Sequence, residues 1–205
     1  MTGPVRSRTE GGGLQVTITV PERRNALSRA VLAELRKAFT SAACGEAAAV
    51  VLSGEGGVFS AGADFADLTG TAADLSFDEE LAATVDAVRY APVPVLAAIE
   101  GPCLGAAAEL ALACDVRIAG LGAWIQVPAV RLGLLYNPAS IARLHRTLPR
   151  TTVTRLILLG ERFNAAAAER AGLISEVVAT GKAAQRATVM ASGLGGAPRE
   201  AITQT

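Results

Sequence analysis

Short apolar blocks recur along the chain with the lengths and flanking residues of β-strands. Residues 14–20, LQVTITV, alternate between apolar and polar, which is the period of a strand with one buried face. Continuous apolar blocks bounded by turn residues predict buried strands at 48–52, 93–99 and 116–119, and a further strand at 173–178. The strands are therefore short and spread over most of the chain.

Helical patterns fill the intervals between these strands. Ser28 is a candidate N-cap for a helix whose apolar residues follow helical spacing from 31 to 39. Asn164 is a second candidate N-cap, for a short helix that ends at Gly172. The other predicted helices lie at 77–88, directly after Gly105, at about 138–148 and at 152–159.

The regular alternation of strands and helices is typical of α/β folds. No internal repeat or linker divides the chain, so residues 1–205 are predicted to form a single domain with its core in 13–180. Residues 124–136 are predicted to form a loop. The segment after Gly181, with its SGLGGAP stretch, is predicted to be loosely structured, and residues 181–205 are interpreted as the start of a C-terminal helical region.

The composition favours a finely packed, helix-rich core. Hydrophobic residues make up 51% of the 205 residues, but only 4% are aromatic, and much of the apolar content is alanine. Basic and acidic residues balance at 19 each, and without a basic stripe the chain is not expected to bind nucleic acid. The N-terminus lacks the apolar core of a signal peptide, and no apolar run approaches membrane-spanning length. A cytoplasmic protein without membrane contact is therefore expected.

Cysteine and histidine are too few for a zinc site. Cys44, Cys103 and Cys114 lack metal-ligand spacing and His145 is the only histidine, so no metal site is predicted. Cys103 and Cys114 are interpreted as small, buried hydrophobic residues. A catalytic Cys–His pair that includes His145 stays open as the less favoured alternative.

The segment 95–115, VLAAIEGPCLGAAAELALACD, places one carboxylate in apolar surroundings. A strand runs into a Gly-Pro turn, and a helix of small residues opens directly after Gly105. Glu109 lies among the Ala and Leu residues of that helix, where a charge is costly and is often kept for chemistry. The free N–H groups and positive dipole end of the helix N-terminus can stabilise developing negative charge. This combination predicts an active site.

Two glycine-containing loops supply candidate hydrogen-bond donors for that site. In the loop GEGGVFSAGAD, Gly62 lets the chain turn the Ala63 N–H inward. In the Gly-Pro loop, Gly105 permits close approach of a ligand, and Ala106 presents its N–H at the start of the helix. Two such groups around one carbonyl oxygen make an oxyanion hole, in which loss of one donor typically costs about 10²–10³ in rate. Glu109 follows Ala106 by three residues and shares its helix face.

The same residues also allow a purely structural interpretation. In that interpretation the two loops are merely tight turns, which glycine-rich loops commonly form, and Glu109 is paired with an arginine. A phosphate-binding loop is excluded, because neither GxxxxGK[ST] nor a helix-opening GxGxxG is present. Two loops that meet at one carboxylate favour catalysis, whereas either loop alone would favour the structural interpretation.

Five segments, in order and in spacing, resemble the crotonase (enoyl-CoA hydratase/isomerase) superfamily. They read PERRNALS, VFSAGADFADL, PVPVLAAIEGPCLGAAAELALACDVRIAG, VRLGL and AGLISEVV, and the match covers about 16–178. The resemblance implies a single-domain, crotonase-like ββα spiral, whose C-terminal helical part is shortened here. It also implies an acyl-CoA thioester substrate, an enolate-type intermediate, and assembly as a homotrimer or dimer of trimers. Coenzyme A belongs to the substrate, and no separate cofactor is implied.

Carried over position by position, the resemblance assigns roles to individual residues. Ala63 and Ala106 would supply the oxyanion-hole N–H groups, and Glu109 would be the catalytic acid/base. From the residues alone, Asp64 is interpreted as a brace for its loop, and Glu100 is expected to meet solvent or a neighbour. The substrate and CoA site would be formed by Arg24, Ala26, Ala61, Asp64, Phe65, Leu104, Gly105 and Tyr136.

The chain departs from the family pattern at the second carboxylate. Hydratases of this family usually carry a second glutamate after a proline, and the matching position here is Ala129, which cannot transfer protons. Tyr136 and Asn137 enter the expected acyl pocket, where Tyr136 is interpreted as a wall residue in preference to a substitute acid. Ala106 and Ala107 replace glycines that are common in the family, and their methyl groups narrow the space for the thioester.

These observations predict hydration of a 2-enoyl-CoA by a single glutamate, which takes a proton from water and returns it to the α-carbon. One alternative is other enolate chemistry on a CoA ester, namely decarboxylation, C–C cleavage or isomerisation. The other is a non-catalytic crotonase-fold protein that binds acyl-CoA. Ala129 is the residue that keeps both alternatives open.

Overall fold

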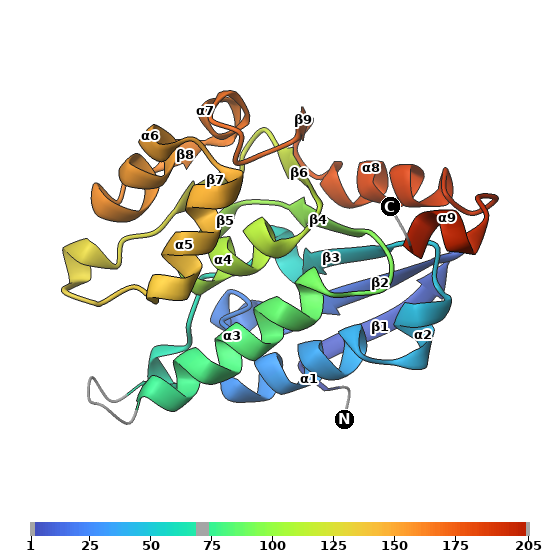
Figure 1. Cartoon of the computed structure of the whole chain (residues 1–205), viewed down its shortest axis with the longest axis horizontal. Coiled ribbons are helices and arrows are strands. Elements are labelled where there is room, and N and C mark those ends of the chain that lie inside the picture. Colours follow the sequence, from blue (N-terminus) through green and yellow to red (C-terminus); the bar gives the residue numbers. More distant parts are fainter. Residues whose placement is uncertain (1–2, 69–73, 204–205) are drawn as a thin grey trace.

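A six-stranded sheet runs through the centre of the molecule (Figure 1). The structure is a computed structural model that describes residues 3–68 and 74–203. The strand order is β1-β2-β3-β4-β6-β9, in which β1 and β2 pair antiparallel and the other neighbours are parallel. The strands are β1 (Val5–Glu10), β2 (Gly13–Ile18), β3 (Val50–Gly54), β4 (Val95–Ile99), β6 (Val116–Gly120) and β9 (Glu176–Val178).

Helices cover both faces of this sheet. On one face, α1 (Arg29–Phe39), α3 (Leu75–Arg89) and α4 (Ala106–Ala113) pack into the larger apolar core. On the other face, α8 (Ala183–Ser192) lies across β3, β4 and β6 (Figure 1). Alternate residues of the strands serve the two faces: in β4, Val95 joins the larger core and Leu96 packs against the α8 side. The sheet is therefore the middle layer of three.

A strand–strand–helix order repeats along the chain. β4 leads into β5 (Pro102–Leu104) and then α4, and β6 leads into β7 (Trp124–Gln126) and then α5 (Pro138–Thr147). β5 pairs parallel with β7, and β7 pairs antiparallel with β8 (Phe163–Asn164), which makes a second, three-stranded sheet. The remaining helices are α2 (Ala42–Glu46), α6 (Arg150–Val153) with its π-helical continuation η6 (Thr154–Leu158), α7 (Ala165–Arg170) and α9 (Arg199–Thr203).

Side-chain caps fix several helix starts. The Ser28 side chain accepts a hydrogen bond from the Val31 N–H, and the Asn164 side chain accepts one from the Ala167 N–H, so both predicted caps are confirmed. Glu100, expected to meet solvent or a neighbour, accepts a hydrogen bond from the Ala183 N–H at 3.0 Å, at the first residue of α8.

None of the helices in the described part of the chain has both the length and the apolar character needed to cross a membrane.

Two expectations about local structure are wrong, and one strand was not predicted. The segment after Gly181 is not loose throughout, because α8 packs three alanines against the sheet. The predicted loop 124–136 contains β7 and a 3₁₀ turn, η5 (Val130–Leu132). β1 was not expected at all, because an edge strand exposed along most of its length carries no apolar alternation.

Candidate active site

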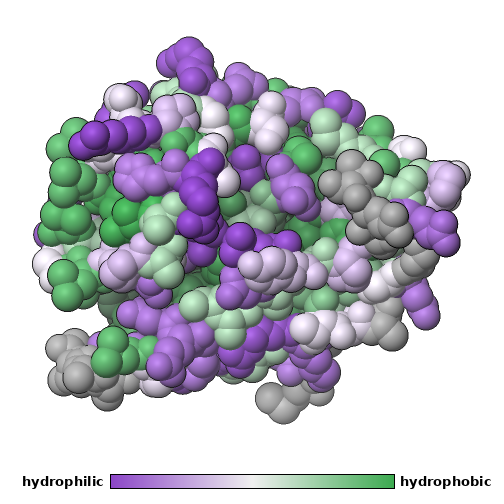
Figure 2. Space-filling model, viewed as in Figure 1, coloured by the Kyte–Doolittle hydropathy of each residue, from purple (hydrophilic) through white to green (hydrophobic). Residues whose placement is uncertain are grey.

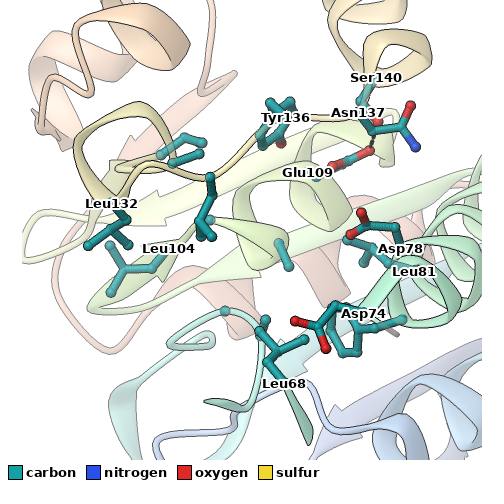
Figure 3. A pocket seen from close by; sticks show the side chains of 18 of the residues that line it. Leu68, Asp74, Asp78, Leu81, Leu104, Glu109, Leu132, Tyr136, Asn137 and Ser140 are labelled. Atoms are coloured by element: carbon teal, nitrogen blue, oxygen red, sulfur yellow. Dashed lines mark hydrogen bonds between the residues drawn. The ribbon is translucent and has the colours of Figure 1, made fainter. Parts of the chain in front are cut away.

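A cavity of about 320 Å³ opens between α3, α4 and the segment that leads into α5 (Figure 3). Its walls are mainly apolar, with Phe77 and Leu81 from α3 facing residues of the 127–137 segment. Of the residues predicted for the site, the following line this cavity: Ala61, Ala63, Phe65, Leu104, Gly105, Ala106, Glu109 and Tyr136. Most of the sequence-predicted residues thus come together around one cavity.

The two glycine-containing loops are in direct contact. A Cβ added at Gly62, whose φ is +88°, would lie 2.5 Å from the Leu104 carbonyl oxygen and 3.6 Å from the Ala106 nitrogen. No side chain larger than hydrogen fits there, so the glycine allows the two backbones to approach each other. The predicted convergence of the loops therefore follows from the local backbone geometry.

Backbone pairing sets the directions of the two candidate N–H donors. The Leu27 N–H donates to Gly62 O and the Asp64 N–H donates to Leu27 O, as in a short parallel bridge. The Gly62 carbonyl and the Ala63 N–H belong to the same trans peptide group and point in opposite directions, so the Ala63 N–H points away from Leu27. Ala106 is the first residue of α4, and its N–H has no carbonyl one turn earlier to bind. Both groups are thus available on the cavity side.

Glu109 is buried, but it is not unpaired. Its side chain is 5% exposed, and its Oε1 accepts a hydrogen bond from Arg143 Nη2 at 2.7 Å and another from Ser140 Oγ. Both donors come from α5, and Arg143 is itself only 12% exposed. The pairing of Glu109 with an arginine, which belongs to the purely structural interpretation, is therefore confirmed. The carboxylate nevertheless lines the cavity.

Tyr136 lies in the cavity wall, as its interpretation as a wall residue expected. Its hydroxyl group is buried and has no hydrogen-bond partner among the described residues. Burial and then the negative charge of the nearby Glu109 raise the pKa of Tyr136 well above its ordinary value. The phenol is thus held in its neutral, hydrogen-bond-donating form beside Glu109.

Asp78 is a carboxylate of the site that the sequence did not single out. It projects from α3 and lines the same cavity as Glu109 (Figure 3). Its side chain makes no hydrogen bond or ion pair with any other described residue. Partial burial, then the charges of Glu109 and Asp74, raise the pKa of Asp78. The four-residue spacing of the two aspartates, beside the apolar residues of α3, is the only sequence signal that could have pointed to it.

Ala129 occupies the wall where relatives were expected to carry a second glutamate. The residue is buried and lines the cavity next to η5. Exposed leucines follow it and lie at the cavity edge, where Figure 2 shows apolar surface: Leu132, Leu134 and Leu135. The segment 127–135 contains no acidic residue, so it contributes no carboxylate to the cavity.

Arg24, Ala26 and Asp64 lie beside the cavity but do not line it. The Ala61 N–H donates to the Arg24 carbonyl at 2.9 Å, which holds the two segments together. Asp64 is buried and accepts hydrogen bonds from the Arg23 guanidinium at 2.7 Å and from the Ala66 N–H at 3.0 Å, so it braces its loop. A role of the three residues in CoA binding stays a prediction.

A catalytic Cys–His pair does not fit this arrangement. Cys103 and Cys114 are buried, and burial raises the pKa of both thiols, that of Cys114 to about 12. His145 is exposed on α5 and does not line the cavity. Because the thiolate is the nucleophilic form, buried thiols of this kind are inert.

Comparison with known proteins decides the family. The sequence pattern of the enoyl-CoA hydratase/isomerase family matches residues 8–205. The chain belongs to the enoyl-CoA hydratase/isomerase family. A family relative, the 2,3-dehydroadipyl-CoA hydratase of Escherichia coli, is 34% identical over 173 residues, which cover 80% of this chain and 65% of the relative. The mitochondrial enoyl-CoA hydratase domain-containing protein 3 of Rattus norvegicus is 32% identical over 201 residues, 96% of this chain and 66% of the relative.

Solved structures of the enoyl-CoA hydratase/isomerase family share the fold. The crystal structure of an enoyl-CoA hydratase from Polaromonas sp. JS666 superimposes with a TM-score of 0.88 at 34% identity, covering 97% of this chain and 80% of that one. The predicted crotonase-like α/β fold is therefore confirmed. The chain spans just under two thirds of the length of the two relatives named above.

Proposed function

We propose that this protein hydrates a 2-enoyl-CoA thioester through an enolate. The Ala63 and Ala106 N–H groups bind the thioester oxygen, and Glu109 is the catalytic acid/base. The observation that carries the proposal is the contact of the Gly62 loop with the start of α4, beside a buried carboxylate that lines the same cavity. Relatives named as hydratases support the same reaction class.

The reaction adds water across the α,β double bond. A water oxygen bonds to the β-carbon, the π electrons move onto the thioester oxygen, and a proton reaches the α-carbon. The two N–H groups stabilise the charge on that oxygen, where one donor is typically worth about 10²–10³ in rate. Acid–base help from Glu109 contributes about 10²–10⁴. The apolar walls, with Phe77 and Leu81, accommodate the acyl chain.

The proposal extends to the cofactor, the assembly and the location of the enzyme. CoA enters as part of the substrate, and hydration requires no metal or redox cofactor. We also propose a cytoplasmic homotrimer or dimer of trimers. The exposed leucines of the 127–135 segment support self-association, since Leu135 is 98% exposed. Multi-angle light scattering of the purified protein measures the assembly.

One observation favours a second function. The buried pair of Glu109 with Arg143 satisfies the carboxylate without any substrate, which is what a non-catalytic acyl-CoA-binding protein would need. Such a protein would bind CoA esters without turnover, and Glu109→Gln would not alter that property.

The test follows the loss of enone absorbance when the purified protein meets crotonyl-CoA. Glu109→Gln keeps the shape of the side chain and removes its acid–base function, so we expect the rate to fall by about 10²–10⁴. Glu79→Gln, an exposed position on α3 outside the cavity, is the matched control and should retain the rate. Full turnover in Glu109→Gln would contradict the proposal. Binding without turnover in the wild-type protein would establish the second function instead.

A further inference from the structure

Hydration requires two proton transfers at different places. One proton leaves the water that attacks the β-carbon, and another arrives at the α-carbon. If one carboxylate serves both, it must reach both carbons within one turnover. Ala129 provides no second group from the 127–135 segment. A second acid would therefore have to come from the opposite wall of the cavity.

Two aspartates, Asp74 and Asp78, line that opposite wall, and the charge of Glu109 acts on Asp78. Asp78 lies on α3, whereas Glu109 lies on α4, and these two helices pack against each other. Figure 3 shows the Asp78 side chain on the side of the cavity that faces Glu109. The charge of Glu109 raises the pKa of Asp78, and the charges of both carboxylates raise the pKa of Tyr136. Three groups capable of proton transfer or hydrogen bonding thus surround one volume.

The surroundings of the two carboxylates differ in a way that separates their roles. Arg143 and Ser140 donate hydrogen bonds to Glu109, and Arg143 forms a buried ion pair with it. Among the described residues Asp78 has no such donor, and its pKa is raised by partial burial and by neighbouring negative charge. Enzymes that use two carboxylates divide the acid and base roles between groups whose surroundings differ in this way.

We propose that Asp78 is the second catalytic residue of this site and exchanges the proton with the α-carbon, while Glu109 serves the water. This inference rests on the hydration proposed above and changes one part of it, because Glu109 no longer returns its proton to the α-carbon. It assigns to α3 the task that family resemblance leaves unfilled at Ala129.

The step balances without any further reactant. Glu109 takes a proton from water as the oxygen bonds to the β-carbon, and the electron pair of the double bond moves into the enolate. The enolate then collapses, and its α-carbon takes the proton of the Asp78 carboxylic acid. Glu109 is left protonated and Asp78 ionised. Asp78 is exposed at the cavity edge, so solvent water returns it to the acid while Glu109 releases its proton.

The experiment measures two reactions for the same variants. The first is hydration of crotonyl-CoA, and the second is exchange of the α-protons of butyryl-CoA with deuterium oxide, which needs the α-carbon group and no attacking water. We expect Asp78→Asn to lower both rates by about 10²-fold or more. Glu109→Gln should lose hydration and retain exchange. Asp78→Glu should recover part of both rates, because it restores the carboxyl group.

Asp86→Asn is the matched control for Asp78→Asn. It removes an exposed aspartate from the same helix, outside the cavity, where its ion pair with Arg89 contributes little. Both rates should stay within twofold of wild type. Binding of butyryl-CoA, measured by calorimetry, should be retained in Asp78→Asn, which separates lost chemistry from lost structure.

The outcomes distinguish this inference from the proposed function. If Asp78→Asn hydrates and exchanges as wild type does, or if exchange depends on Glu109 alone, the assignment of Asp78 is overturned and the single-glutamate hydratase stands. If wild-type protein exchanges α-protons through Asp78 but does not hydrate, the hydratase proposal fails and the role of Asp78 at the α-carbon is supported. If wild-type protein does neither, both proposals fall.

Discussion

The Arg143 guanidinium has a structural as well as an electrostatic function at Glu109. A carboxylate with a 5% exposed side chain loses most of its hydration, and the hydrogen bonds from Arg143 and Ser140 replace it. Buried pairs of this kind seldom stabilise a protein relative to an apolar pair of similar size. Removal of one partner alone is costly, however, because the other charge is left buried and unpaired.

Arg143→Met should therefore lower the free energy of unfolding by about 3–5 kcal/mol, measured by urea denaturation. Glu109→Gln added to Arg143→Met should recover part of that loss, because the buried charge is then gone. Arg146→Met, at an exposed position of the same helix, is the control and should change stability by less than about 0.5 kcal/mol. A loss at Arg143 no larger than at Arg146 would show that the pair does not hold Glu109.

Single residues also mark the limits of sequence reasoning at the site. Glu109 and the Ala63 and Ala106 N–H groups are predicted site groups, because a charge in an apolar helix and glycines beside tight turns are local signals. The partnership of Glu109 with Arg143 was not predictable, because the two residues are 34 positions apart on different helices. Asp78 was not predicted, because in the sequence it looks like any exposed helix aspartate. Only the packing of α3 against α4 brings it to the cavity.

At the level of elements, the contact between the Gly62 loop and the start of α4 sets the shape of the site. Gly62→Ala would combine a left-handed backbone with a Cβ placed 2.5 Å from the Leu104 carbonyl oxygen. Gly57 provides a matched control, since its φ is +75° and a Cβ there would meet nothing within 4 Å. The pair separates backbone strain from close approach.

Gly57→Ala should cost about 1–2 kcal/mol of stability, the strain of a left-handed residue, and leave crotonyl-CoA hydration unchanged. Gly62→Ala should cost more and should also slow hydration, because the loops must move apart and the two N–H donors no longer converge. Thermal unfolding and steady-state rates measure the two effects. Equal behaviour of the two variants would mean that the loops do not depend on this contact.

The same elements show which patterns carry structural information. Strands with alternating or continuous apolar residues were predicted close to their observed positions, as were the helices capped by Ser28 and Asn164. β1 was missed because its exposed residues satisfy only backbone pairing with β2. Residues 181–205 were interpreted as the start of a helical region, but the packing of Ala183, Ala187 and Ala191 of α8 against the sheet was not predicted, because small residues carry no signal of what they contact.

At the scale of the whole molecule, α8 forms the third layer, on the face of the central sheet opposite α1, α3 and α4. Its alanines contact small and medium residues of the central sheet, so the helix lies close to the strands. Ala187→Leu should overpack this interface and lower the free energy of unfolding by about 1–3 kcal/mol. Val189→Leu, where the native side chain is 59% exposed on the same helix, should be nearly neutral. Similar losses in both variants would show that α8 does not seal this face.

The three cysteine thiols of the folded protein are protected from reagents in solution. All of them are free and buried, and burial raises the pKa of each thiol. An alkylating reagent therefore gains access only when the chain opens. Cys44 belongs to the short helix α2, whereas Cys103 lies in β5 and Cys114 follows α4. The labelling rate of Cys44 therefore reports local opening at α2, whereas the rates of Cys103 and Cys114 report opening of the layers around the cavity.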